Sequence, residues 1–162
     1  MRLTEEFFAR DSREVAQDLL GRELVRSISP RRIYRGRITE TGAYHGYIEK
    51  RKREGLAYAP GMIFLYVGQR GYATFCIATE SEGEPSVVTI RELYPLEGID
   101  MPVDGPAKLV KALRIDKDFN GKSINGSNLW VEGEAVDSSR IELVSPRQRK
   151  MADNCLGYYK IV

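Results

Sequence analysis

The segment Gly36–Tyr44 places chemically capable side chains at alternating positions of an expected strand. Glu40 and residue 42 have the same parity along the strand, so both face the same side. A carboxylate at such a position can activate water as a general base, whereas Gly42 has no side chain to do so. Arg91, in the segment Thr89–Leu93, has a planar guanidinium that can bind a phosphate or orient a water. These residue types suit hydrolysis or the binding of a phosphate-bearing substrate.

The same segment resembles the active-site strand of the alkyladenine, or 3-methyladenine, DNA glycosylases. That strand usually contains Glu-Thr-Glu-Ala-Tyr, and its second Glu activates the hydrolytic water. This chain has Glu40-Thr-Gly-Ala-Tyr44, so Gly42 takes the place of the second Glu. Other segments resemble the family in order and approximate spacing, and the resemblance spans about residues 3–131. These segments are Ala59–Tyr66, Ile90–Gly98 and Gly105–Leu113, the last continuing to Gly121.

The resemblance implies a pocket for a purine that has been extruded from the DNA duplex and is held between flat walls. Tyr44 and Tyr66 match the two tyrosines that face the extruded base, and the alternative for both is a core or sheet-surface position. The family's stacking histidine has no direct counterpart, and the single histidine, His45, is a candidate substrate contact, with a partly exposed loop residue as the expected alternative. Ala78 takes the place of the asparagine that rejects guanine, which implies a wider and less selective pocket.

A second group of residues is expected to contact the DNA. The family has an intercalating tyrosine at a hairpin tip, where this chain has Gln69 and Arg70, followed by Tyr72. Arg70 can also contact a phosphate, although exposed hairpin tips are polar in most proteins. Lys108 lies in the first turn of a helix expected to begin at Pro106, where the helix dipole favours an anion such as a DNA phosphate. A solvated lysine is the alternative there.

The missing glutamate leaves the water-activating group open. Arg91 matches an arginine beside the reacting nucleotide and the catalytic water, with an ion pair to Glu92 or Glu97 as the alternative. Glu40 is a candidate general base, but two residues along a strand span about 7 Å, and the resemblance gives Glu40 a supporting position. Loss of a general base lowers the reaction rate by about 10²- to 10⁴-fold. Residual activity is more credible on cationic 3-methyladenine, which leaves without further protonation, than on neutral hypoxanthine.

The elements that position these residues can be predicted from local patterns. Asp11 and Glu14 resemble a capping box before an apolar helical face that Gly21 can end. Leu109, Val110 and Leu113 give the helix after Gly105-Pro106 a buried face. A polar loop is expected over Gly46–Ala59, and a compact connection over Gly68–Gly71. The expected strands are Glu23–Ile28, Ile33–Thr41, Met62–Val67, Tyr72–Thr79 and Ser86–Leu93, and the final third is strand-like and rich in turns.

Composition limits the class of protein. The chain has 162 residues, 42% of them hydrophobic, which suits a single domain over residues 1–162. The chain has 25 Lys and Arg residues against 23 Asp and Glu residues, so any basic surface that binds nucleic acid must be local. The runs Lys50–Arg53 and Arg147–Lys150 are candidates for such a surface, with solvated loops as the alternative. The two cysteines are far apart, so we expect no metal site and no cofactor. No apolar stretch is long enough for a membrane span, and an intracellular protein is expected.

These observations predict a mixed α/β (α+β) domain with a curved, mostly antiparallel sheet flanked by short helices, as in the resembled family. The leading hypothesis is a monomeric protein of base-excision repair that binds duplex DNA and flips or excises alkylated purines. A second hypothesis is a non-catalytic DNA- or nucleotide-binding relative that has lost hydrolysis. A third is an unrelated β-rich domain that acts on a small molecule or a protein.

Overall fold

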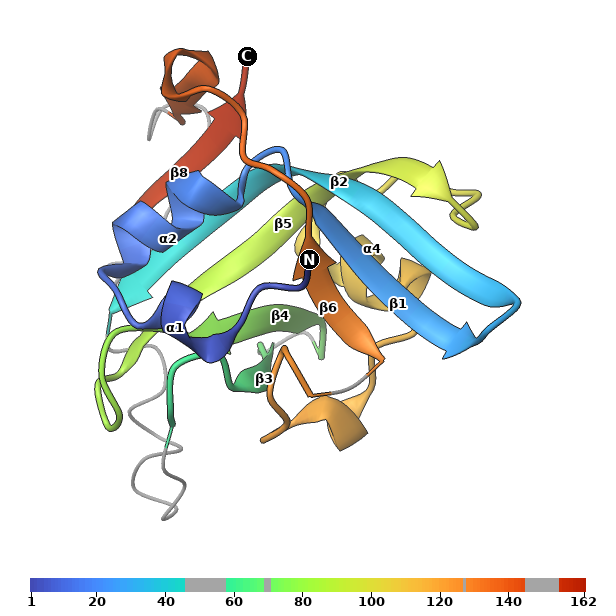
Figure 1. The fold of residues 1–162 in the computed structure, drawn as a ribbon, viewed down its shortest axis with the longest axis horizontal. Helices are drawn as coiled ribbons and strands as arrows, with labels where there is room; N and C mark the ends of the chain where they lie inside the picture. Colours follow the sequence, from blue (N-terminus) through green and yellow to red (C-terminus); the bar gives the residue numbers. More distant parts are fainter. Residues whose placement is uncertain (46–57, 69–70, 127, 145–154) are drawn as a thin grey trace.

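A curled antiparallel sheet forms the centre of the molecule, shown in Figure 1. The computed structural model describes residues 1–45, 58–68, 71–126, 128–144 and 155–162. In these residues the sheet has eight strands, which are β1 (Glu23–Ser29), β2 (Arg32–His45), β3 (Ile63–Val67), β4 (Ala73–Ala78), β5 (Ser86–Glu97), β6 (Leu129–Glu132), β7 (Ile141–Leu143) and β8 (Cys155–Ile161). The helices are α1 (Glu5–Phe8), α2 (Ser12–Leu19) and α4 (Pro106–Ala112), with the 3₁₀ turns η1 (Lys117–Phe119) and η2 (Ser138–Arg140).

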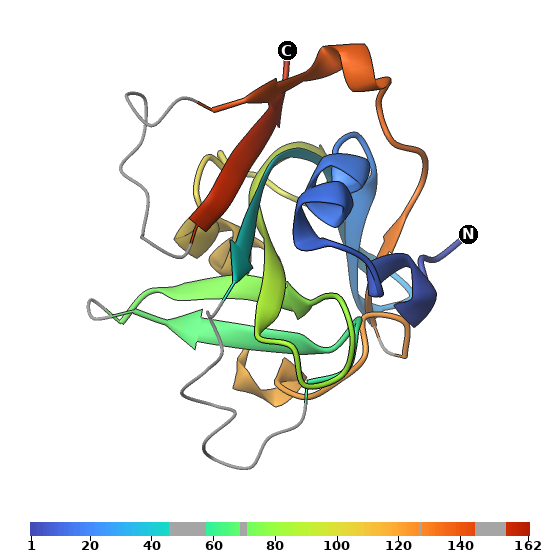
Figure 2. The same ribbon diagram turned by 90° about the vertical axis from the view of Figure 1, so that its left-hand side faces the viewer.

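The long strand β2 organises the sheet. The order β3-β4-β5-β2-β1-β6 forms one path, and β8 pairs with both β2 and β7. The first half of β2 pairs with β1, whereas its second half lies between β5 and β8 (Figure 2). Any side chain on the second half of β2 therefore has neighbours on two flanking strands.

Local residue patterns determine where two of the helices begin or end. Asp11 is the N-cap of α2, and its Oδ1 accepts a hydrogen bond of 2.8 Å from the Arg13 N–H, which satisfies one of the exposed donors of the first turn. The helix stops before Gly21, whose φ of +91° is left-handed and costs glycine little. Pro106 occupies the first turn of α4, where its missing N–H does no harm.

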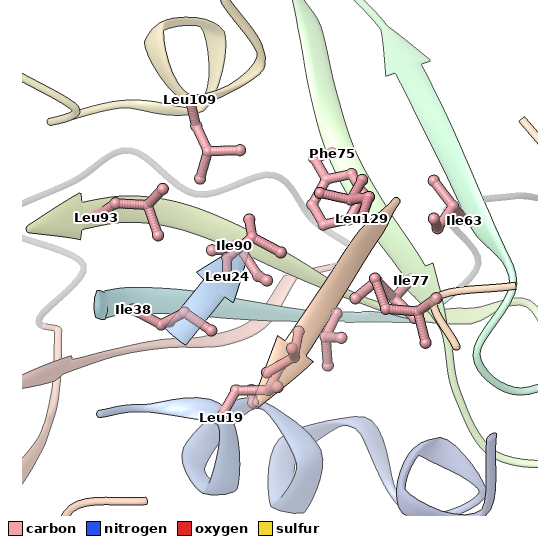
Figure 3. Close-up of a cluster of buried hydrophobic side chains, with 14 of the residues drawn as sticks. Leu19, Leu24, Ile38, Ile63, Phe75, Ile77, Ile90, Leu93, Leu109 and Leu129 are labelled. Atoms are coloured by element: carbon pink, nitrogen blue, oxygen red, sulfur yellow. The ribbon is translucent and has the colours of Figure 1, made fainter. Parts of the chain in front are cut away.

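A continuous apolar core joins the sheet to these helices, as the side chains in Figure 3 show. Leu19 of α2 and Leu109 of α4 are fully buried against it. Burying each side chain of this size contributes about 1.5–3 kcal/mol. From the strands the core takes Leu24, Ile38, Ile63, Phe75, Ile77, Ile90 and Leu129.

The predicted α+β domain with a curved antiparallel sheet is confirmed. Two strands extend well beyond their predicted ends, because β2 continues to His45 and β5 continues to Glu97, whereas the other strand ends differ from the prediction by at most one residue. The two strands pair with one another along this extra length, and that pairing supplies backbone hydrogen bonds that local propensity does not predict. His45 is accordingly a strand residue and not a loop residue as expected. Residues 46–57 of the predicted loop, the hairpin residues Gln69 and Arg70, and both basic runs lie outside the described residues.

Candidate functional site

The expected active-site strand, β2, lies between β5 and β8 at residue 42. Gly42 is paired with Thr89 of β5 on one side and with Tyr158 of β8 on the other. Cross-strand partners place their side chains on the same face of a sheet, so Thr89 and Tyr158 flank the position that a side chain at residue 42 would occupy. Register along β8 is continuous from Glu40 to Gly42, which confirms that these two positions share a face.

Irregular pairing between β2 and β5 places Arg91 at the site. Ile38 pairs with Leu93, Glu40 with Glu92 and Thr41 with Ile90, so the register shifts on both sides of Glu40. Such bulges redirect side chains and are frequent next to functional sites. The consequence here is that Arg91 points toward Glu40 on the neighbouring strand.

Glu40 and Arg91 form a buried ion pair. The Glu40 Oε2 atom lies 3.4 Å from the Arg91 Nε atom, and their side chains are only 2% and 12% exposed. Of the alternative partners expected for Arg91, Glu97 lies 3.5 Å from Arg35. The pair brings together a carboxylate and a guanidinium, which are the two groups expected to activate and orient a water, but both are largely closed off from solvent.

Tyr158 contacts both Tyr44 and Arg91 on the face of the sheet over Gly42. Its phenolic oxygen shares a hydrogen bond of 2.5 Å with that of Tyr44, and their ring centroids lie 6.0 Å apart at an interplanar angle of 60°. The guanidinium carbon of Arg91 lies 4.0 Å from the centroid of the Tyr158 ring, a distance typical of a cation–π contact. Burial, together with the hydrogen bond to Tyr158, raises the pKa of the Tyr44 phenol well above its ordinary value. Tyr44 is therefore neutral and cannot serve as a base near neutral pH.

The ring of Tyr158 fills the place of a side chain at residue 42. A Cβ atom built on Gly42 would lie 2.8 Å from the Tyr158 Cδ1, 2.9 Å from its Cε1 and 2.8 Å from the Thr89 Oγ1. Real Cβ atoms essentially never make contacts this short, so in this arrangement residue 42 has room only for glycine.

The expected base-binding residues have different degrees of exposure. Tyr44 is only 4% exposed and Ala78 only 1%, and both belong to a second apolar cluster with Phe64, Cys76 and Tyr158. Tyr66 on β3 is 40% exposed and available to a ligand. The structure thus brings Tyr44 and Ala78 together in a packed cluster.

His45 lies at the exposed end of β2. Its Nδ1 atom is 2.9 Å from the Oγ atom of Ser86, its partner across the strands. This contact orients the imidazole at the edge of the sheet. The second apolar cluster that contains Tyr44 does not include it.

Two of the expected DNA contacts lie around one hollow of about 550 Å³ between β4 and α4. Tyr72, which is 65% exposed, and Lys108 both line it. Lys108 also pairs with Asp104, its Nζ atom lying 2.6 Å from the Oδ1 atom. The same hollow contains two cations that the sequence analysis did not single out, Lys111 and Arg114.

Arg114 and Lys111 also line a second hollow of about 410 Å³, so the two cations lie between two concavities. The guanidinium carbon of Arg114 is 5.7 Å from the centroid of the Tyr34 ring. The linings combine these cations with aromatic rings, and also with Asp116 in the first hollow and Asp100 in the second. The position of both cations on the last turn and exit of a short helix gave no distinctive signal in the sequence.

Tyr158 and Thr89 are the residues at the site that sequence reasoning missed. Tyr158 lies in β8, beyond the last segment that resembles the family, and its contacts with β2 depend on long-range pairing. The one available signal was Gly42 itself, because a glycine inside a long strand often marks the close approach of another group.

Within the described residues, no cluster of three or more histidine, cysteine or acidic side chains is arranged to hold a metal ion. None of the helices in this part of the chain has the length and apolarity to cross a bilayer.

Comparison with known proteins identifies relatives over most of the chain. A family model described as methylpurine-DNA glycosylase matches residues 6–149, which continues past the segments noted in the sequence. A protein of Anaeromyxobacter sp. strain Fw109-5 named "Putative 3-methyladenine DNA glycosylase" is 38% identical over 152 residues, which cover 87% of this chain and 77% of the relative. A protein of Clostridium botulinum strain Langeland with the same name is 34% identical over 163 residues, which cover 82% of this chain and 80% of that protein.

Proposed function

Because this chain belongs to the methylpurine-DNA glycosylase family, we propose that it binds duplex DNA and recognises alkylated purines such as 3-methyladenine. We further propose that it does so without hydrolysis in the arrangement described above. The observation that carries this proposal is the ring of Tyr158, which fills the space of a side chain at residue 42, where the resembled strand has its water-activating glutamate. We propose that residues 1–162 form one domain and that the protein acts as a monomer.

The surface between β4 and α4 supports the DNA part of the proposal. Tyr72, Lys108, Lys111 and Arg114 line one hollow, and they offer an exposed aromatic ring together with three cations. Phosphate contacts from such cations supply most of the affinity of a DNA-binding protein and little of its sequence preference. Gln69 and Arg70 are proposed to extend this contact at the hairpin.

Recognition of the lesion is assigned to Tyr66 and the adjoining cluster. Tyr66 is exposed enough to stack on a base, whereas Tyr44 is held in the cluster by its hydrogen bond to Tyr158. Stacking of a base on an aromatic ring contributes about 1–3 kcal/mol and tolerates many bases. Ala78 is small but only 1% exposed, so a base would reach it only if the cluster opened.

Excision of the base is the second candidate function, and the Glu40–Arg91 pair favours it. This pair places a carboxylate and a guanidinium on the face of β2 that contains residue 42. In this mechanism Glu40 takes a proton from water while Arg91 orients the water or a phosphate. The step requires water to reach a carboxylate that is 2% exposed, so the side chains that cover it would have to move.

The experiment that tests the proposal measures binding and base release on the same DNA. Fluorescence anisotropy with methylated and unmethylated duplexes should show salt-sensitive binding that is tighter for the methylated duplex. Single-turnover assays for released 3-methyladenine and 7-methylguanine should give no signal above a protein-free blank. Absence of DNA affinity at low salt would refute the proposal, and release that is abolished by Glu40→Gln would establish excision instead.

A further inference from the structure

We propose that Tyr158 has taken over the space of the family's water-activating carboxylate, so that residues 42 and 158 together decide whether this site can hydrolyse. The inference rests on the proposed function, since it concerns the same site. It predicts that exchanging both residues, but neither alone, makes the protein a glycosylase.

Space, and not backbone conformation, keeps residue 42 a glycine. Gly42 sits within the regular pairing of β2, between Thr89 and Tyr158, and it is absent from the glycines with left-handed φ. Any side chain can adopt such a backbone, yet a Cβ atom would lie within 2.9 Å of the Tyr158 ring and of the Thr89 hydroxyl. The obstacle to a carboxylate at this position is therefore the neighbouring side chains.

Displacing the ring of Tyr158 to make room for such a side chain would cost stability. Tyr158 is only 5% exposed. Its hydroxyl shares a hydrogen bond with that of Tyr44, and the guanidinium of Arg91 lies over the face of its ring. Moving the ring would break both contacts and open a cavity in the second apolar cluster. Glycine at 42 and tyrosine at 158 are thus a matched pair.

Polar groups around the ring would suit a carboxylate if the ring were removed. The Thr89 hydroxyl is fully buried, and among the described residues its Oγ1 atom has no hydrogen-bond partner. A buried hydroxyl in this state is costly, and a carboxylate at 42 would accept its hydrogen bond. Arg91 lies next to the Tyr158 ring and would supply a nearby positive charge.

The predicted reaction is hydrolysis of the N-glycosidic bond of a cationic alkylated purine. The carboxylate at 42 takes one proton from water while the water oxygen bonds to the sugar C1′ atom. The C1′–N bond breaks, and its electron pair neutralises the departing base. The products are an abasic site and a neutral base, and the proton passes from the carboxylate to solvent.

The test compares Gly42→Glu/Tyr158→Ala with the matched control Gly42→Gln/Tyr158→Ala, which has the same size but no base. Both are assayed in the full chain for single-turnover release of 3-methyladenine from methylated duplex DNA, with binding measured in parallel. We expect the Glu variant to release the base at least about 10²-fold faster than the Gln variant and the wild type. Equal rates for the two double variants, with both still binding the DNA, would overturn the inference and leave the proposed function standing. Loss of binding by the wild type would instead overturn the proposed function and this inference with it.

A thermal-unfolding cycle keeps the inference testable should a double variant fold poorly. Gly42→Ala is expected to lower the melting temperature of the wild type by several degrees, and to lower it less in a Tyr158→Ala background, where the close contact with the Thr89 hydroxyl remains but the tyrosine ring is gone. This coupling is the signature of a steric conflict between the two positions. Equal effects in the two backgrounds would show that Tyr158 does not exclude a side chain at residue 42.

Discussion

Arg91 and Tyr158 join two strands that do not pair with each other. The guanidinium carbon of Arg91 on β5 lies 4.0 Å from the centroid of the Tyr158 ring on β8, across the intervening strand β2. Together with the Glu40–Arg91 pair and the Tyr44–Tyr158 hydrogen bond, this contact makes one connected group of side chains over β2. Its members are coupled in stability, and mutations within the group should not be additive.

Removing Arg91 should be far more damaging than removing the whole ion pair. Arg91→Met takes the guanidinium from a carboxylate that is 2% exposed, and breaking such a buried pair costs about 3–5 kcal/mol of unfolding free energy. Glu40→Gln/Arg91→Met should recover much of this loss, since no buried charge remains. Urea unfolding of the wild type, Glu40→Gln, Arg91→Met and the double variant measures the cycle. A double variant as unstable as the sum of the two single variants would contradict the pairing.

The buried phenol of Tyr44 should make the fold sensitive to alkali. Burial raises the pKa of Tyr44 in the folded state above its ordinary value of 10.0. The unfolded chain then loses this proton above about pH 10 while the folded chain keeps it, so stability is retained below that pH and falls as pH rises. The expected slope from this group is about 1.4 kcal/mol per pH unit.

Tyr44→Phe should remove this contribution from the slope. Tyr94→Phe, at a tyrosine that is 62% exposed on β5, is the matched control and should leave the slope unchanged. Denaturant unfolding between pH 8 and pH 11 gives the comparison. If the wild type and Tyr44→Phe lose stability in parallel, Tyr44 is not buried as a neutral phenol.

Local signals in the sequence predict the elements well, and long-range pairing explains what they miss. The cap at Asp11 and the left-handed Gly21 bound α2 through interactions within a few residues. The face shared by Glu40 and residue 42 follows from the two-residue period of a strand. Tyr158, by contrast, is 114 positions from Tyr44, the residue to which it is bonded, and nothing local specifies which strand β8 joins. The presence of Tyr158 at the site therefore depends on the pairing of β8 with β2, which local sequence patterns do not predict.

Gly21 should be one of the least replaceable glycines. Its φ is +91°, and a Cβ atom there would lie 2.5 Å from the Val136 Cγ1 and 2.7 Å from the Val136 backbone nitrogen, which itself donates to Leu20. Gly83 has a similar φ of +88° but no atom within 4 Å of a Cβ. Gly83→Ala should therefore cost only the conformational strain of about 1–2 kcal/mol.

Gly21→Ala should cost that strain and a further 1–3 kcal/mol or so for overpacking. Thermal or urea unfolding of the two alanine variants isolates the crowding, because the backbone strain is common to both. Equal destabilisation of the two would show that the chain before η2, at Val136, can move away from Gly21 without cost.

The cations between the two hollows should account for part of the salt dependence of DNA binding. Lys111 and Arg114 line both concavities. If each neutralises one phosphate, each contributes about 0.9 to the slope of log affinity against log salt. Lys111→Gln and Arg114→Gln should each reduce the slope by about that amount and weaken binding similarly for methylated and unmethylated duplexes.

Arg13→Gln on α2 removes one positive charge from another part of the molecule and is the matched control. It should leave the slope nearly unchanged, because a bound phosphate acts on cations that contact it and not on the net charge. Anisotropy titrations at several salt concentrations make the comparison. A slope reduced equally by all three variants would mean that DNA responds to the overall charge, and that the surface between β4 and α4 is not its contact.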